Sequence, residues 1–382
     1  MNVTTHIEAF VEELRQKGAF IAPRLEDAVR GVPRHFFIEQ YYDKGNLVRF
    51  DPEHGTDEQF GLVYSDSGLT IRKPPTHSAA SQPCLVMWML ADLDIQSGDK
   101  ALEIGTGSGW NAGLMAFLVG DGDLVYSMDA QPDLIDQAGT HLRSAGIEGV
   151  NLRAGDGGHG WPEAAPFDRI VATVGCPDIL PAWREQLAEE GVLLVPLKTS
   201  GIGDPLIRLR KRDGRMIGGF SRWSWFGALQ GDYWTGAEDI LEEPFEPWLD
   251  SLLQEDRRVV ALPEVVTRDC LFFLRLKGLR FQGVRSKNPS ELLGGYLHHE
   301  SGSVFCPDMQ WPVLRLYGNS DLGKLVSNCQ KEWIRLRRPG ISDFHVELVD
   351  RDAACSDSQS WLDKRQHACL KFTLGRETDR HQ

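Results

Sequence analysis

The chain has 382 residues, with 41 Lys and Arg against 55 Asp and Glu, which gives a formal charge of −14 at pH 7. This length exceeds one ordinary domain and predicts two, while the acidic balance argues against a nucleic-acid partner. No apolar run of about 18 residues and no signal-peptide core occur, so we expect no membrane contact and a soluble, cytoplasmic protein.

The first predicted element is an amphipathic helix near the N-terminus. Ile7, Phe10, Val11 and Leu14 recur at helical spacing, and Gly18 follows as a stop signal. We expect residues 1–75 to form a helical lead-in to the domain that follows.

A glycine-rich turn is the most informative feature of the chain. The apolar segment from Ala101 to Ile104 runs into Gly105-Thr106-Gly107-Ser108-Gly109. Alternating glycines let the backbone pass close under a ligand, and a helix from about Trp110 would present free N–H groups to it. A dinucleotide fingerprint requires glycine where Trp110 stands, so the pattern favours S-adenosylmethionine over NAD.

Further strands alternate with helical segments after this turn. Segment 124–128 predicts a strand that ends at Asp129, whose carboxylate would accept both ribose hydroxyls. A strand at 150–153 leads into Gly155-Asp156-Gly157, which would meet the adenine edge. For Asp129 and Asp156 an ordinary turn or cap role is the alternative.

The apolar strand 168–173 follows, and a helix is expected at 132–145 between the second and third strands. This alternation predicts an α/β fold with a doubly wound, Rossmann-like parallel sheet in residues 76–205.

The chain resembles the protein-L-isoaspartate O-methyltransferase family over about residues 5–200. The segments that carry the resemblance are Val32–Phe37, Ser81-Gln82-Pro83, Leu102–Asn111, Gly155–Pro162 and Ala165–Ile170. The family's active-site serine lies about 24 residues before the first glycine of the turn, and Ser81 matches that position (105 − 81 = 24). Two alanines, Ala79 and Ala80, replace the family's usual Thr-Ile before it.

The resemblance implies S-adenosylmethionine as cofactor and Ser81 as the catalytic residue. A carboxylate is ionised at neutral pH, so methyl transfer to it needs no general base, only alignment and exclusion of water. Ser81 would donate a hydrogen bond to that carboxylate. The alternative is that Ser81 caps the helix that begins near Pro83.

The remaining site assignments combine the strand pattern with the resemblance. Substrate contacts are expected from Gln82, Val174 and Gly175. Cofactor contacts are expected from Glu103, Gly105, Thr106, Gly107, Ser108, Gly109, Asn111, Asp129, Ala130, Gly155, Asp156, Gly157 and Thr173.

The chain continues well past the point where the family's repair enzymes end. Strands are expected at 206–210, 270–274, 344–349 and 368–374, with a helix at 320–336. Residues 206–382 are therefore expected to form a folded α+β extension that recognises a peptide. The basic residues Arg335, Arg337 and Arg338 either complement the dipole of that helix or bind an anion.

Seven cysteines occur without a Cys-x-x-Cys pair, which indicates thiols in a reducing compartment. His298-His299-Glu300 and His367 with Cys369 lack a full ligand set, so no metal site is expected.

We interpret the chain as a carboxyl O-methyltransferase that acts on an aspartate of a ribosomally made peptide, as in lanthipeptide, graspetide or lasso peptide clusters. The ester would then close to an aspartimide. This interpretation follows from the resemblance to extended family members. The alternatives are repair of isoaspartyl residues in damaged proteins and a module that binds a peptide or S-adenosylhomocysteine without turnover.

Overall fold

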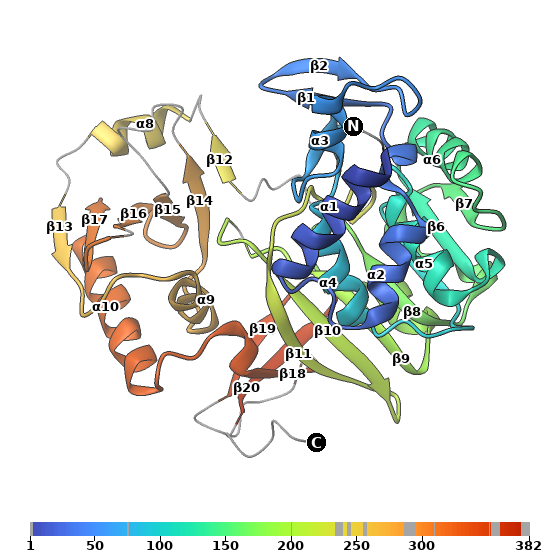
Figure 1. The fold of residues 1–382 in the computed structure, drawn as a ribbon. Helices are drawn as coiled ribbons and strands as arrows, with labels where there is room; N and C mark the ends of the chain where they lie inside the picture. Colours follow the sequence, from blue (N-terminus) through green and yellow to red (C-terminus); the bar gives the residue numbers. More distant parts are fainter. Residues whose placement is uncertain are drawn as a thin grey trace. The chain divides into compact units, whose positions relative to one another are not determined.

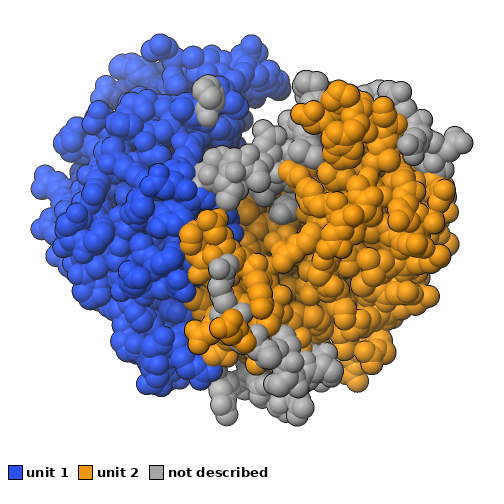
Figure 2. All heavy atoms as spheres, turned by 180° about the vertical axis from the view of Figure 1, so that it is seen from behind, with its two compact units in different colours: residues 1–196, 208–216, 226–234 blue, residues 197–207, 217–225, 235–382 orange. Residues whose placement is uncertain are grey.

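The fold is that of a computed structural model, which describes residues 3–74, 76–199, 201–233, 240–242, 246–254, 258–285, 295–308, 310–350, 352 and 360–375. The chain divides into two compact units, coloured separately in Figure 2. Unit 1 comprises residues 1–196, 208–216 and 226–234, and unit 2 comprises residues 197–207, 217–225 and 235–382. The expected boundary between residues 205 and 206 falls inside a strand, β10 (Asp204–Arg212).

Unit 1 contains the N-terminal elements and the predicted methyltransferase sheet (Figure 1). Its helices are α1 Val3–Gln16, α2 Pro23–Gly31, α3 Asp57–Val63, α4 Pro83–Leu93, α5 Trp110–Val119, α6 Pro132–Ser144 and α7 Pro181–Gln186, with 3-10 turns η1 Arg34–Phe37, η2 Gly122–Leu124, η3 Gly157–His159 and η4 Pro162–Ala164. Its strands are β1 Gln40–Asp43, β2 Asn46–Arg49, β3 Leu69–Arg72, β4 Ser78–Ala80, β5 Ala101–Ile104, β6 Val125–Asp129, β7 Asn151–Ala154, β8 Phe167–Ala172 and β9 Leu187–Pro196. Strands β10 and β11 (Arg215–Ser224) contribute residues to both units.

The centre of unit 1 is a parallel sheet in the order β9-β8-β5-β6-β7. The four residues of β5 are buried, and so are the last four of β8, as expected for strands covered on both faces. The chain runs outward from β5 to β7 and then returns to β8 on the other side of β5. The predicted α/β fold with a doubly wound sheet is therefore confirmed.

Local signals set the helix ends in unit 1. Proline stands in the first turn of α2, α4, α6 and α7, where its missing N–H costs nothing. Gly120 ends α5 in the left-handed conformation. Helix α1 buries Phe10, Val11 and Leu14 of the predicted stripe.

Unit 2 holds the C-terminal elements. Its helices are α8 Pro247–Gln254, α9 Arg268–Leu276 and α10 Ser320–Arg335, with the 3-10 turn η5 Ile341–Asp343, and its strands are β12 Ile240–Glu242, β13 Arg258–Ala261, β14 Phe281–Arg285, β15 Gly295–His298, β16 Ser303–Pro307, β17 Val313–Tyr317, β18 Phe344–Val349, β19 Ser360–Lys364 and β20 Cys369–Leu374.

Two separate sheets organise unit 2. The first is a ten-stranded sheet, of which the consecutive antiparallel neighbours β19-β20-β18-β11 form one end, and the second is a six-stranded sheet in the order β12-β14-β15-β16-β17-β13. Phe220, Phe272, Phe344 and Phe372 form an aromatic cluster on the first sheet. The extension is therefore a folded α+β unit with a core of its own, as the sequence predicts.

The predicted strand at 270–274 is wrong, because these residues belong to helix α9. Cys270, Leu271, Phe272, Phe273 and Leu274 are all buried, so the segment is apolar throughout and shows no strand or helix period. The Thr267 side chain accepts from the Cys270 N–H at 3.2 Å and caps the helix.

The C-terminal basic residues lie at the end of α10. Arg335 is in its last turn, and Arg338 forms an ion pair with Glu264. Six of the seven cysteines lie among the described residues, where all six are buried thiols outside any disulfide. In the described part of the chain no helix combines the length and apolarity that crossing a membrane requires.

Candidate active site

The carboxyl ends of the parallel strands bring the predicted cofactor residues to one edge of the sheet. The glycine turn follows β5, Asp129 ends β6, Gly155 follows β7 and Thr173 follows β8. β5 and β8 are parallel neighbours, but successive strands are added on one side of β5 up to β7 and on its other side from β8, and ligands of doubly wound sheets bind at such a switch point.

The three glycines of the turn have different neighbours. All three have positive φ, between 52° and 105°. A Cβ on Gly105 would lie 2.6 Å from Thr173 Oγ1, and one on Gly109 would lie 3.0 Å from the Ala138 Cβ. A Cβ on Gly107 would meet nothing closer than Ser78 Oγ at 3.8 Å, so the turn is open on that side. Gly107 is therefore where a ligand can approach the backbone.

Glu103, at the end of β5 before the turn, is fully buried and belongs to a polar network. Ser127 Oγ donates to Glu103 Oε2 at 2.5 Å, and Asn111 Nδ2 donates to Oε1 at 2.7 Å. Thr106 Oγ1 shares a hydrogen bond of 2.6 Å with Ser127 Oγ, which links the turn to the same network. Burial raises the pKa of Glu103 to about 7. Glu103 and Asn111 thus hold the base of the turn.

This network predicts a pH-dependent stability. The folded pKa of Glu103 is raised, so its contribution to stability is present at low pH and is lost as pH rises through about 7. Between about pH 6 and 8 the free energy of unfolding should fall by about 1 kcal/mol from this group. The amide in Glu103→Gln stays neutral at both pH values. The free energy of unfolding of this variant, measured with urea, should therefore not show this fall of about 1 kcal/mol between about pH 6 and 8. Glu163→Gln, at an exposed carboxylate, is the control, and an equal pH response in both variants would contradict the assignment.

Asp129 turns its carboxylate toward the glycine turn. Its Oδ2 accepts from the Gly107 N–H at 3.0 Å, and its Oδ1 accepts from the Gln131 N–H at 3.0 Å. Burial raises the pKa of Asp129, although these N–H groups and the nearby Arg72 oppose the shift. Each carboxylate oxygen retains a further lone pair for a hydroxyl donor. The neighbouring Ala130 is exposed.

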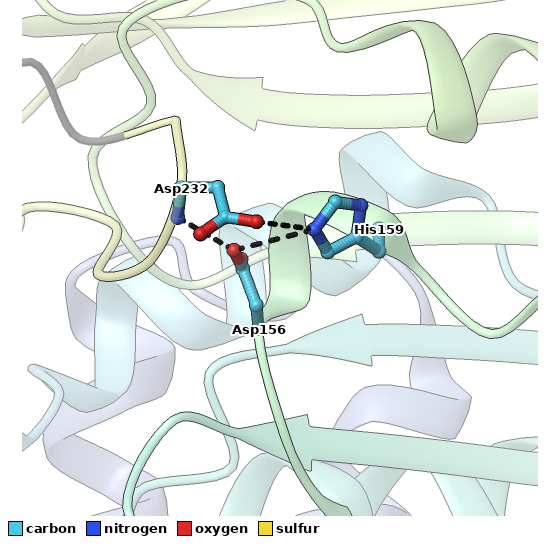
Figure 3. Close-up of side chains that lie close together, drawn as sticks. All are labelled: Asp156, His159 and Asp232. Carbon is cyan, nitrogen blue, oxygen red and sulfur yellow. Dashed lines mark hydrogen bonds and ion pairs between the residues drawn. The ribbon is translucent and has the colours of Figure 1, made fainter.

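Asp156 bonds to two backbone segments. Its Oδ1 accepts from the Gly158 N–H at 2.8 Å, and its Oδ2 accepts from the Asp232 N–H at 2.7 Å. Figure 3 shows Asp156, His159 and Asp232 pointing toward one another, with His159 Nε2 3.0 Å from Asp232 Oδ2. Their potential ligand atoms lie within 4.8 Å of one another. The hydrogen bonds and ion pairs of these groups to one another account for the cluster, and we assign no metal to it.

The end of β8 forms the opposite wall of the turn. Thr173 Oγ1 donates to Gly105 O at 2.6 Å, and the Val174 side chain lies beside Gly105. Gly175 exchanges hydrogen bonds with residues 227 and 229 of unit 1, its N–H donating to Gly227 O at 2.7 Å. This return of the chain to the end of β8 was not anticipated from the sequence, because the two segments are about 50 residues apart.

Ser81 lies between β4 and α4, and the structure does not use it as a cap. Gln82 is the N-cap residue of α4, with no side-chain cap bond, and Pro83 opens the helix. Instead Asp66 accepts from the Cys84 N–H at 2.8 Å and from Gln82 Nε2 at 3.0 Å. Among the described residues the Ser81 hydroxyl has no hydrogen-bond partner, and it is half-buried. The hydroxyl is thus available for a ligand.

The strand before Ser81 lies next to the glycine turn. Ser78 Oγ and Ala79 O are the atoms nearest the open side of Gly107. Of the other turn residues, Ser108 offers its carbonyl to His141 Nδ1 at 2.9 Å, and Gly157 packs against Ile104. The structure therefore groups Ser81, the turn, Asp129 and the end of β8 at one edge of the sheet. Sequence reasoning missed Ser127 and Asp66, which act through contacts distant in the chain.

Comparison with known proteins identifies the family. The profile of the family described as protein-L-isoaspartate(D-aspartate) O-methyltransferase matches residues 5–221, which is more than half of the chain. The chain belongs to this family. A protein-L-isoaspartate O-methyltransferase of Pyrococcus horikoshii is 34% identical over 207 residues, which cover 54% of this chain and 84% of that protein. A protein-L-isoaspartate O-methyltransferase of Methanoculleus marisnigri is 37% identical over 193 residues, which cover 50% of this chain and 77% of that protein.

Membership makes the protein an S-adenosylmethionine-dependent protein carboxyl O-methyltransferase, and confirms that part of the sequence prediction. A solved structure titled protein-L-isoaspartate O-methyltransferase aligns with a TM-score of 0.55 at 22% identity, covering 92% of this chain and all of the other. This likeness in fold extends past residue 221, where the family profile ends.

Proposed function

We propose that the protein methylates the free α-carboxylate of an isoaspartyl residue, whose peptide bond runs through its side-chain carbonyl, in a peptide or protein. The observation that carries this proposal is that the strand leading into Ser81 lies beside the glycine turn, which is bonded to Asp129, in a chain of this family. Its relatives from Pyrococcus horikoshii and Methanoculleus marisnigri are named for the same substrate.

The residues present fit the cofactor. Gly107 leaves space that a Cβ would fill, and the Asp129 carboxylate has acceptor capacity for ribose hydroxyls. We propose that Gly155 and Asp156 lie next to the adenine end of the cofactor. We propose that the role of Glu103, Asn111 and Thr173 is to hold the turn in place. Asn111 donates a hydrogen bond to Glu103, and Thr173 donates one to the Gly105 carbonyl in the turn.

When bound, S-adenosylmethionine supplies a methyl group on a positively charged sulfur. A carboxylate oxygen of the peptide forms the new bond to this methyl carbon while the carbon–sulfur bond breaks, which leaves a methyl ester and a neutral thioether. No proton moves, so the Ser81 hydroxyl only has to orient the carboxylate by donating a hydrogen bond. Gln82 and the backbone at Val174 and Gly175 would hold the peptide.

A second candidate is methylation of one aspartate in a ribosomally made, modified peptide, followed by closure to an aspartimide. The observation that favours it is unit 2, a folded unit with its own core that offers surface for selecting one peptide. The presence of the extension does not by itself distinguish the two candidate functions. The solved structure of a protein-L-isoaspartate O-methyltransferase also aligns in fold over 92% of this chain.

A comparison of two substrates tests the proposal. A short isoaspartyl peptide should be methylated with a higher kcat/KM than the cyclised precursor peptide that carries an ordinary aspartate, as read by mass spectrometry. Faster methylation of the cyclised peptide would overturn the isoaspartyl proposal in favour of the second candidate. The full chain must be used, because a truncation after Thr199 would remove residues 208–216 and 226–234 from unit 1. Ser81→Ala serves as the control for turnover at this site.

A further inference from the structure

Arg34 is a buried cation that binds four backbone carbonyls. It lies in η1 after Pro33 and is 1% exposed. Its Nη1 donates to Val63 O at 2.9 Å and to Ser65 O at 3.0 Å, and its Nη2 donates to Ser67 O at 3.0 Å and to Ser81 O at 3.1 Å. A charge is rarely buried unless its donors are used, and here the two Nη groups donate four hydrogen bonds while the buried Nε has no partner among the described residues. The guanidinium therefore ties the loop 63–67 to the backbone of Ser81.

Asp66 links the same two segments through its side chain. It belongs to the loop whose carbonyls Arg34 binds, and its carboxylate accepts from Cys84 N and Gln82 Nε2 at the start of α4. Lys17 Nζ lies 2.9 Å from Asp66 Oδ2 and supplies an opposite charge. Ser81 is thus held at its own carbonyl by Arg34 and through the following helical turn by Asp66.

The guanidinium also contacts the cofactor side. Arg34 Cζ lies 5.4 Å from the centroid of the Trp110 ring, and Trp110 is the first residue of α5 after the glycine turn. Trp110 Nε1 donates to Val32 O at 3.0 Å, which anchors the ring to the segment that carries Arg34. One side chain therefore contacts both the Ser81 backbone and the residue that follows the turn.

We propose that Arg34, together with Asp66, is a positioning residue that sets the distance and direction of the Ser81 hydroxyl relative to the glycine turn. The proposal rests on the catalytic role proposed for Ser81. A lysine cannot replace the arginine, because one ammonium has three donors and no planar face to span four carbonyls and a ring.

A double-mutant cycle tests the proposal in the full-length protein. Arg34→Lys should lower kcat for an isoaspartyl peptide about fivefold, while calorimetric Kd for S-adenosylmethionine changes less than twofold. In the Ser81→Ala background the same change should alter kcat less than twofold, since the positioned hydroxyl is already absent. Arg169→Lys is the matched control, because Arg169 is a buried arginine that donates to Asp94 O at 3.0 Å near the opposite end of the sheet. It should leave kcat unchanged.

The outcomes separate the two claims. If Ser81→Ala has no effect on kcat, the role proposed for Ser81 fails. If Ser81→Ala lowers kcat but Arg34→Lys lowers it equally in both backgrounds, the positioning role is overturned and Arg34 acts on the fold alone. If Arg34→Lys does not fold, the same double-mutant cycle is measured with Asp66→Asn in its place. Full additivity of Asp66→Asn with Ser81→Ala would also overturn the proposal.

Discussion

Replacement of Ser81 by alanine is expected to lower kcat for an isoaspartyl peptide tenfold or more, with Kd for S-adenosylmethionine nearly unchanged. A hydrogen bond from a hydroxyl to an ionised carboxylate contributes about 1.5–3 kcal/mol, and here it would align the attacking oxygen. Helix α4 does not depend on this hydroxyl, since Asp66 bonds to its first turn. Single-turnover kinetics and calorimetry measure the two effects separately.

Ser97→Ala is the matched control for this prediction. Ser97 Oγ donates to Val119 O at 3.2 Å, in the loop that precedes β5 and thus at the end of the sheet opposite the turn. We expect neither kcat nor cofactor affinity to change in it. A loss of cofactor affinity in Ser81→Ala as large as its loss of kcat would show that Ser81 maintains the conformation of the glycine turn and does not orient the substrate.

Replacement of Asp129 by alanine is expected to weaken S-adenosylmethionine binding by about 2 kcal/mol, or roughly 30-fold in Kd. The change removes an ionised acceptor for the ribose hydroxyls and also leaves the N–H groups of Gly107 and Gln131 without their partner. Calorimetry at fixed pH and salt gives the affinity.

Two variants separate these causes. Asp129→Asn keeps one carbonyl acceptor, so its affinity for S-adenosylmethionine should lie between those of the wild type and Asp129→Ala. Asp133→Asn changes an exposed acid that pairs with Arg72, and it should bind S-adenosylmethionine with wild-type affinity. Wild-type affinity in Asp129→Ala would remove this residue from the cofactor site. Thermal unfolding of each variant shows whether the turn remains folded.

Much of unit 1 follows from local patterns. The strands β5, β6 and β8 are largely apolar segments, a glycine follows β5 and an acid ends β6, so their alternation with helices was enough to predict a doubly wound sheet. Helix α10 and strand β18 were also predicted, because their periods of 3.6 and 2 are visible in single windows of sequence. The error at α9 arose where burial on every side removes that period.

The family and its methyl-transfer chemistry followed from the sequence alone, since they depend on short segments whose residues are adjacent in the chain. The tertiary structure decided how the site is held. Glu103 turns inward to Ser127, Asp66 rather than Ser81 bonds to the first turn of α4, and Arg34 reaches carbonyls 29 to 47 residues away. Such contacts leave no local period, because a buried polar group is satisfied by whichever distant segment the packing brings to it.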